Sequence, residues 1–172
     1  MRLFLLAFLF PTIVLADARV NELQALVPGM IDFIESRGVN SYKGDTYPQI
    51  YIVNEQDVCT GAYGKPVDTC DIAGYYNDDT NEIYIRDEPT ENMSEDRFQE
   101  VVLVHELVHF LQYFDGTWQK VECKQELEAH AYEVQDAYVD LYGIDPEQKI
   151  DPLFGLLSSM CPKKNLMFYH EQ

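Results

Sequence analysis

The sequence predicts a single domain of the α+β class, and two observations carry this prediction. The predicted segments occur in the order helix, strand, hairpin, helix and helix, which is typical of an α+β domain built in packed layers. The chain has 172 residues, of which 47% are hydrophobic, and this is enough for one domain with a proper core. We therefore expect a small antiparallel-containing sheet packed against two long helices.

The first 16 residues have the pattern of a secretory signal peptide. One positive residue, Arg2, precedes a short apolar run, and Val14 and Ala16 occupy the small-residue positions of a cleavage site. The mature domain would then span 17–172. The segment is short for a membrane span and no later apolar stretch is long enough, so we expect a secreted or periplasmic protein without stable membrane insertion. The competing interpretation is a retained N-terminal anchor.

All four cysteines follow the predicted cleavage site, and an even count in an exported chain indicates two disulfides. The sequence allows three pairings. We favour Cys59–Cys70, which would close a short polar loop, and Cys123–Cys161, which would pin the C-terminal segment to a helix.

The chain is strongly acidic, with a formal net charge of −18. This charge argues against a nucleic-acid partner, because binding to phosphates needs a basic surface. It either favours cationic peptides or only keeps an exported protein in solution.

An N-terminal helix is predicted over 20–37, where apolar residues recur at three- and four-residue spacings. We expect a kink or interruption at Pro28 and Gly29 and an end at Gly38. This helix would back the sheet.

The strands are predicted in the next part of the chain. The segment 47–53 is rich in β-branched and aromatic residues. The segment 54–71 is expected to be a loop ordered mainly by its disulfide. Two further strands, 72–77 and 82–86, flank a four-residue polar turn and form a hairpin.

Three helices are predicted after the hairpin. The apolar segment 97–114 should start near Ser94, a good helix cap with acidic residues behind it. A second long helix is expected over 118–142, stopped by Gly143. A short C-terminal helix should follow before Cys161.

The helix over 97–114 contains the motif His-Glu-x-x-His. His105 and His109 are four residues apart, so both imidazoles lie on one helix face and can reach one metal ion. Glu106 lies about 100° round the helix, where a carboxylate can act as general base towards a water on the metal. The alternative is an ordinary amphipathic helix, but the apolar flanks indicate burial, which is costly for these side chains unless a metal satisfies them.

A catalytic zinc site normally has three protein ligands, so one more donor is needed. The segment 123–133 contains three carboxylates and a histidine. On the wheel of a continuous helix, Glu126 lies at the margin of the buried face, His130 lies one turn further on, and Glu128 points towards solvent. We predict Glu126 as the third ligand, with His130 and Glu128 as alternatives.

The motif, followed by Glu126-x-x-Ala129-His130, resembles the gluzincin clan of zinc metallopeptidases, particularly its small single-domain members. In those families the ligand Glu is followed by Ala and an acidic residue, and here His130 replaces that acid. The resemblance covers roughly 72–134 and includes the hairpin. It implies a zincin-like domain with one zinc ion held by His105, His109 and Glu126.

The resemblance and the motif together predict an exported zinc metallopeptidase that acts on a peptide or protein substrate. Glu106 would be the general base, and His130 or Tyr132 would stabilise the oxyanion. An extended peptide could add to the exposed edge of the hairpin. The alternative is a binding protein that keeps the fold and has lost turnover. The small size favours that alternative, whereas the intact Glu106 argues against it.

Overall fold

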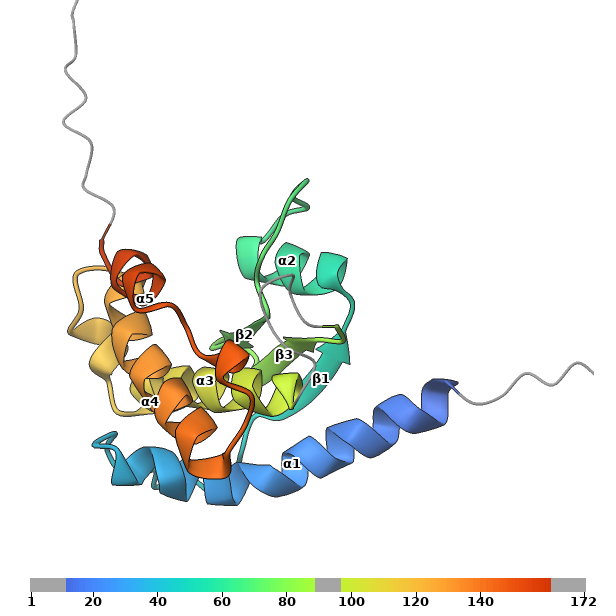
Figure 1. Cartoon of the computed structure of the whole chain (residues 1–172), viewed down its shortest axis with the longest axis horizontal. Coiled ribbons are helices and arrows are strands. Elements are labelled where there is room, and N and C mark those ends of the chain that lie inside the picture. Colours follow the sequence, from blue (N-terminus) through green and yellow to red (C-terminus); the bar gives the residue numbers. More distant parts are fainter. Residues whose placement is uncertain (1–11, 89–96, 162–172) are drawn as a thin grey trace, which may run out of the picture.

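The structure is a computed structural model that describes residues 12–88 and 97–161 (Figure 1). Its helices and strands, in chain order, are α1 (Thr12–Ser36), β1 (Gln49–Val53), α2 (Glu55–Tyr63), β2 (Gly74–Asn77), β3 (Glu82–Arg86), α3 (Phe98–Phe114), α4 (Glu128–Tyr142) and α5 (Pro152–Ser158). Three short 3-10 turns, η1 (Thr117–Gln119), η2 (Lys124–Leu127) and η3 (Pro146–Gln148), lie between the later helices. The predicted α+β class is confirmed.

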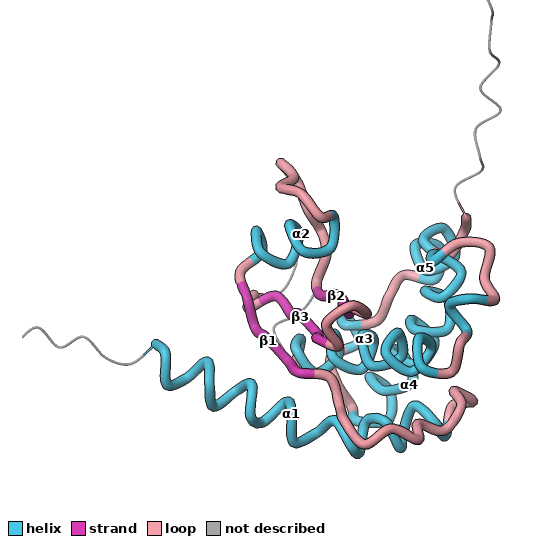
Figure 2. The backbone as a smooth tube through the Cα atoms, turned by 180° about the vertical axis from the view of Figure 1, so that it is seen from behind, coloured by secondary structure: helices cyan, strands magenta, loops and turns pink. Residues whose placement is uncertain are grey.

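Helix α3 forms the centre of the molecule. It packs against α4, α1 and the sheet, so that protein surrounds it on nearly every side (Figures 1 and 2). A helix that is apolar all round needs such an environment, and the side chains of Leu103, Leu107 and Phe110 are fully buried. The predicted helix over 97–114 is confirmed, while its expected start at Ser94 lies outside the described residues. The central position gives the motif residues a rigid support.

The three strands form one mixed sheet in the order β1-β3-β2. Strand β1 is parallel to β3, and β2 pairs with β3 antiparallel as the predicted hairpin, with Tyr75 opposite Tyr84. One face buries Ile50, Ile83 and Ile85 in the core. Strand β2 forms one edge of the sheet and lies next to α3, which brings the edge close to the motif helix.

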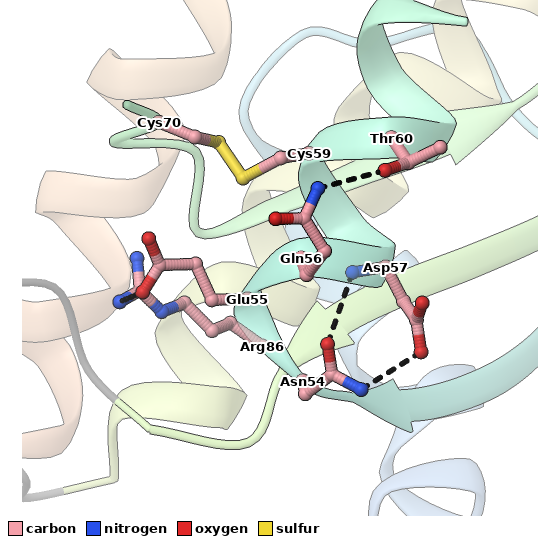
Figure 3. The surroundings of a disulfide bond; sticks show 8 residues. All are labelled: Asn54, Glu55, Gln56, Asp57, Cys59, Thr60, Cys70 and Arg86. Carbon is pink, nitrogen blue, oxygen red and sulfur yellow. Dashed lines mark hydrogen bonds and ion pairs between the residues drawn. A yellow bond between two sulfur atoms is a disulfide. The ribbon is translucent and has the colours of Figure 1, made fainter. Parts of the chain in front are cut away.

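Helix α2 occupies part of the segment that was predicted to be a loop. Asn54 caps it, because its side-chain oxygen accepts a hydrogen bond from the backbone N–H of Asp57 at 3.1 Å (Figure 3). Gly64 ends it with φ 68°, the left-handed conformation that suits glycine. The predicted Cys59–Cys70 disulfide ties this helix to the chain that leads into β2. The polar composition of this segment explains why a loop was predicted where the chain forms a helix that packs against β2 and β3.

The prediction of a second long helix is wrong for its first ten residues, 118–127. Instead of one helix over 118–142, the chain forms η1 and η2 and begins α4 only at Glu128. Cys123, which lies before η2, has an extended backbone and forms the predicted disulfide with Cys161. Gly143 ends α4 with φ 61°, as predicted. The interruption changes which side chains of this segment face α3.

The N-terminal helix is present but longer than predicted. Helix α1 begins at Thr12, eight residues before the predicted start and ahead of the predicted cleavage site, and it runs through Pro28 to Ser36 without interruption. It backs the sheet and α3, as expected. The short helix α5 follows a cap at Asp151 and packs against α4. Most of the predicted signal peptide, 1–16, lies outside the described residues. Within the described part of the chain, we find no helix with the length and apolar character needed to cross a membrane.

Candidate metal centre

The two histidines of the motif point to the same place. His105 and His109 project from successive turns of α3, and their Nε2 atoms lie 3.1 Å apart. Both residues are almost buried, each with 8% of its surface exposed. Two ring nitrogens at this separation need a proton or a cation between them, because their lone pairs otherwise repel each other.

Glu128, the first residue of α4, supplies a third donor to this place. Its Oε2 lies 3.2 Å from Nε2 of His105, and its Oε1 lies 3.4 Å from Nε2 of His109. A tetrahedral ion with metal–ligand distances of about 2.0–2.1 Å separates its ligand atoms by about 3.3 Å. The three donors are therefore spaced as the ligands of one small divalent metal such as zinc, and they form the group that we call the metal centre.

A buried glutamine holds each histidine ring. The Nδ1 of His105 lies 3.0 Å from Oε1 of Gln135, and the Nδ1 of His109 lies 2.9 Å from Oε1 of Gln112. The amide nitrogens of these glutamines donate to the backbone carbonyls of Gln148 and Leu127.

Because each amide nitrogen is used in this way, the amide oxygen faces the ring and can only accept. Each Nδ1 therefore carries a hydrogen, and each Nε2 is the ring nitrogen that could bind a metal. Partners of this kind orient metal-binding histidines in proteins.

The charges at the centre are strongly coupled. Burial lowers the pKa of His109, but the hydrogen bond and negative charge of Glu128 outweigh this and raise the pKa to about 9. Burial would raise the pKa of the Glu128 carboxyl, whereas its hydrogen bonds to His105 and His109 and their charges hold that pKa well below its usual value. Glu128 is thus an anion paired with a proton on the histidines, and a divalent cation could replace that proton.

Glu106 lies on the side of α3 that faces β2. Its carboxylate accepts a hydrogen bond from the backbone N–H of Tyr76, and burial raises its pKa above the usual value. The absence of a side chain at Gly74 leaves the space that Glu106 uses, because a Cβ there would lie 3.4 Å from Cγ of Glu106. The buried carboxyl therefore sits between the metal centre and the edge of the sheet, with a raised affinity for a proton.

Tyr132 packs beside the centre. It lies one turn after Glu128 on α4, and its ring centroid is 4.7 Å from that of His105. Burial and the charge of Glu128 raise its pKa to about 12, so the phenol keeps its proton at neutral pH. Its neutral O–H can donate a hydrogen bond.

The structure places Glu126, the predicted third ligand, away from the metal centre. Glu126 is exposed, and its Oε1 accepts a hydrogen bond from the backbone N–H of Glu122 beside the Cys123–Cys161 disulfide. The prediction assumed one continuous helix, but Glu126 lies in η2, before α4 begins. Geometry therefore favours Glu128, which the same assumption had turned towards solvent.

His130 also lies apart from the centre. It follows Glu128 by two residues on α4, which places it about 200° round the helix from that carboxylate. Within the described chain it belongs to neither group of donors that could hold a metal. Its predicted role next to the reacting atoms therefore has no geometric support, and Tyr132, the alternative, lies closer.

Sequence reasoning missed Gln112 and Gln135. A signal for Gln112 existed, since this polar residue interrupts an apolar run one turn after His109. An amide in a buried position needs a partner, and the nearby ring is the obvious one. Gln135 had no comparable signal, because its contact to His105 crosses between two helices.

Comparison with known proteins gives the family of the chain. No curated protein and no solved structure matches it. The model of a family described as a domain of unknown function, DUF6647, matches residues 20–167. This match spans most of the chain and includes every residue of the metal centre. The chain therefore belongs to the DUF6647 family.

Proposed function

We propose that this chain is an exported zinc-dependent peptidase with a zincin-like domain. One observation carries the proposal: two histidine Nε2 atoms and the Glu128 carboxylate converge at 3.1–3.4 Å, with both rings held by glutamine amides. Two histidines, which would be neutral once a metal replaces their shared proton, and one carboxylate form a donor set typical of catalytic zinc sites, which keep a further position open. The two disulfides support the proposed export.

Zinc held by these donors would act as a Lewis acid on a carbonyl group and lower the pKa of a bound water towards neutrality. Glu106 would accept a proton from the attacking water and pass it to the leaving amine. Its burial suits both steps, because a carboxyl with a raised pKa returns a proton more readily than an exposed one does.

Two further parts of the chain would orient the substrate. Strand β2 is at the edge of the described sheet, and an extended peptide could pair with that edge as an added strand. The neutral phenol of Tyr132 would donate a hydrogen bond to the oxyanion that forms at the scissile carbonyl. The peptide would then pass close to both Glu106 and Tyr132.

Metal analysis combined with peptide digestion tests the proposal. We expect about one zinc ion per purified chain and cleavage of a mixed peptide library by the unaltered protein. Glu106→Gln should keep the zinc and lower the rate of cleavage by about 10²- to 10⁴-fold, the usual contribution of a general base.

Each other outcome has a clear meaning. A chain that binds no divalent metal would contradict the proposal. Stoichiometric zinc without any cleavage would indicate a binding protein that keeps the site. Cleavage that is unchanged in Glu106→Gln would exclude the mechanism.

A further inference from the structure

Helix α5 exposes an unusual concentration of apolar side chains. The large hydrophobic residues of this helix and the turn after it have between 55% and 63% of their surface exposed: Leu153, Phe154, Leu156, Leu157 and Met160. Single exposed apolar residues are normal on a protein surface, but a contiguous group of them marks an interaction site. We call these five residues the α5 patch.

A pocket lies between the α5 patch and α4. Its apolar lining includes Ala129, Tyr132, Ile150, Pro152 and Leu156. Its volume of about 230 Å³ is below the roughly 300–1,000 Å³ of pockets that hold a whole small molecule. The pocket therefore suits one large side chain rather than an entire ligand. We call it the α4–α5 pocket.

The α4–α5 pocket lies next to the metal centre, because Tyr132 contacts the centre and lines the pocket. This ring contacts His105 at a centroid distance of 4.7 Å and Phe154 of α5 at 6.4 Å. Tyr132 thus forms a wall shared by the centre and the pocket. A side chain held in the pocket would therefore be separated from the centre by the ring of Tyr132.

The position of α5 is fixed by several contacts. The carboxylate of Asp151 caps α5 by accepting hydrogen bonds from the N–H groups of Leu153 and Phe154. Tyr132 forms a hydrogen bond with Ser158, and the Cys123–Cys161 disulfide anchors the chain after the helix. A preorganised surface loses less entropy on binding than a mobile one.

We propose that the α4–α5 pocket binds a large apolar side chain of the peptide substrate, close to the bond that is cleaved. This inference rests on the proposed function, and it names the class of substrate: peptides with a bulky apolar residue near the scissile bond. Tyr132 and Leu156 would contact that side chain. Among the residues of the α5 patch, Leu156 is the one that lines the pocket.

The lining of the pocket favours an apolar side chain, because most of it is apolar. Three carboxylates border the pocket. Asp136 accepts a hydrogen bond from the N–H of Ile150, Asp151 caps α5, and Glu133 is exposed. Burial raises the pKa of Asp136, and the charge of Lys149, which pairs with Asp140, offsets this only in part.

Gly155 offers a way to fill the pocket without disturbing the fold. A Cβ at this position would lie 3.5 Å from Ile150 and 3.8 Å from Tyr132, which are ordinary contacts. In Gly155→Leu the remaining side-chain atoms would occupy the pocket. Leu156→Ala would remove one of its walls. Leu141→Ala is the matched control, since Leu141 has 59% of its surface exposed, Leu156 has 60%, and only Leu156 lines the pocket.

The first readout is the sequence preference of cleavage in a peptide library. We expect the unaltered protein to prefer large apolar residues over alanine at one position by about 10- to 100-fold, the range that hydrophobic pockets achieve. Gly155→Leu and Leu156→Ala should lower this ratio about tenfold with unchanged zinc content, and Leu141→Ala should leave it unaltered. An unchanged ratio in both pocket variants, or a preference for lysine and arginine, would overturn the inference.

The second readout does not depend on turnover. Fluorescence anisotropy would measure binding of labelled, non-cleavable peptides that carry either leucine or alanine at the preferred position, or at each position in turn if no cleavage occurs. Selective binding of the leucine peptides that Gly155→Leu abolishes would support the pocket even in a protein without zinc or cleavage, and only the proposed function would then fail. Equal binding of leucine and alanine peptides would overturn the inference.

Discussion

The ring Nδ1 of His109 lies 2.9 Å from Oε1 of Gln112, one turn further along the same helix. The amide nitrogen of Gln112 donates to the carbonyl of Leu127, the residue before Glu128. A single buried side chain therefore connects one predicted metal ligand to the start of the helix that carries another. The geometry of the centre depends on the packing of α3 against α4.

We predict that Gln112→Leu weakens metal binding without unfolding the protein. Leucine has a similar size, but it cannot fix the ring of His109, and loss of such a partner typically costs 10- to 100-fold in metal affinity. Competition with a zinc-binding dye would measure the change. Gln99→Leu, on the same helix and remote from the centre, is the control and should bind metal normally. Equal affinities in the two variants would contradict the role of Gln112.

The third ligand can be identified by three alanine variants. Glu128→Ala should remove most of the bound zinc, because it deletes the only carboxylate of the described centre that bridges both histidines. Glu126→Ala and His130→Ala should keep the metal, since neither side chain belongs to the described centre. Zinc content after dialysis gives the answer. Loss of zinc in Glu126→Ala but not in Glu128→Ala would restore the ligand expected from the sequence.

The motif and the third ligand differ in how far sequence alone could predict them. His105, Glu106 and His109 lie within one regular helix, so their relative directions follow from its period. Glu128 follows η1 and η2, and these turns interrupt the helix that the prediction assumed. On the wheel of that assumed helix, Glu126 and not Glu128 lay near the buried face. The period of a helix does not predict the direction of side chains beyond such a break. The same limit explains why Gln135, which reaches His105 from another helix, had no signal.

The sheet and the disulfides show the same distinction. Hairpin strands and a four-residue turn are local features, and they were predicted within two residues. The parallel pairing of β1 with β3 joins distant segments and had no local signal. Both disulfides that the sequence favoured are present. The first closes a short segment, and the second joins the C-terminal segment to an earlier part of the chain, as expected. Helix α2 was missed, since its residues are mostly polar and its cap, Asn54, looked like part of a loop.

Both disulfides should stabilise the protein, and the second should contribute more. Cys59 and Cys70 are separated by 11 residues, whereas Cys123 and Cys161 are separated by 38. The chain-entropy model assigns about 3 kcal/mol to the shorter loop and about 4 kcal/mol to the longer one. Urea denaturation of the two paired Cys→Ala variants would measure the free energies of unfolding. Free-thiol labelling of the denatured, non-reduced protein should find none, and four free thiols would contradict both bridges.

The last prediction concerns Gly74, where β2 approaches the motif helix. A Cβ at this position would lie 2.6 Å from Cγ1 of Val102 and 2.9 Å from the backbone oxygen of Tyr84. The strand partner cannot move without disturbing the sheet, so Gly74→Ala should lower the free energy of unfolding by about 1–3 kcal/mol, the usual cost of overpacking.

Gly74→Ala should also displace Glu106, the proposed general base. Cγ of Glu106 lies 3.4 Å from the added Cβ, so a shift of the strand would also displace the carboxylate. The metal donors are held instead by contacts between α3 and α4. Gly74→Ala should therefore lower cleavage and stability with zinc content unchanged. Gly29→Ala is the control, because no atom lies within 4 Å of its added Cβ and alanine favours a helix by about 1 kcal/mol. If urea denaturation found Gly74→Ala as stable as Gly29→Ala, β2 would not pack against α3 as closely as described.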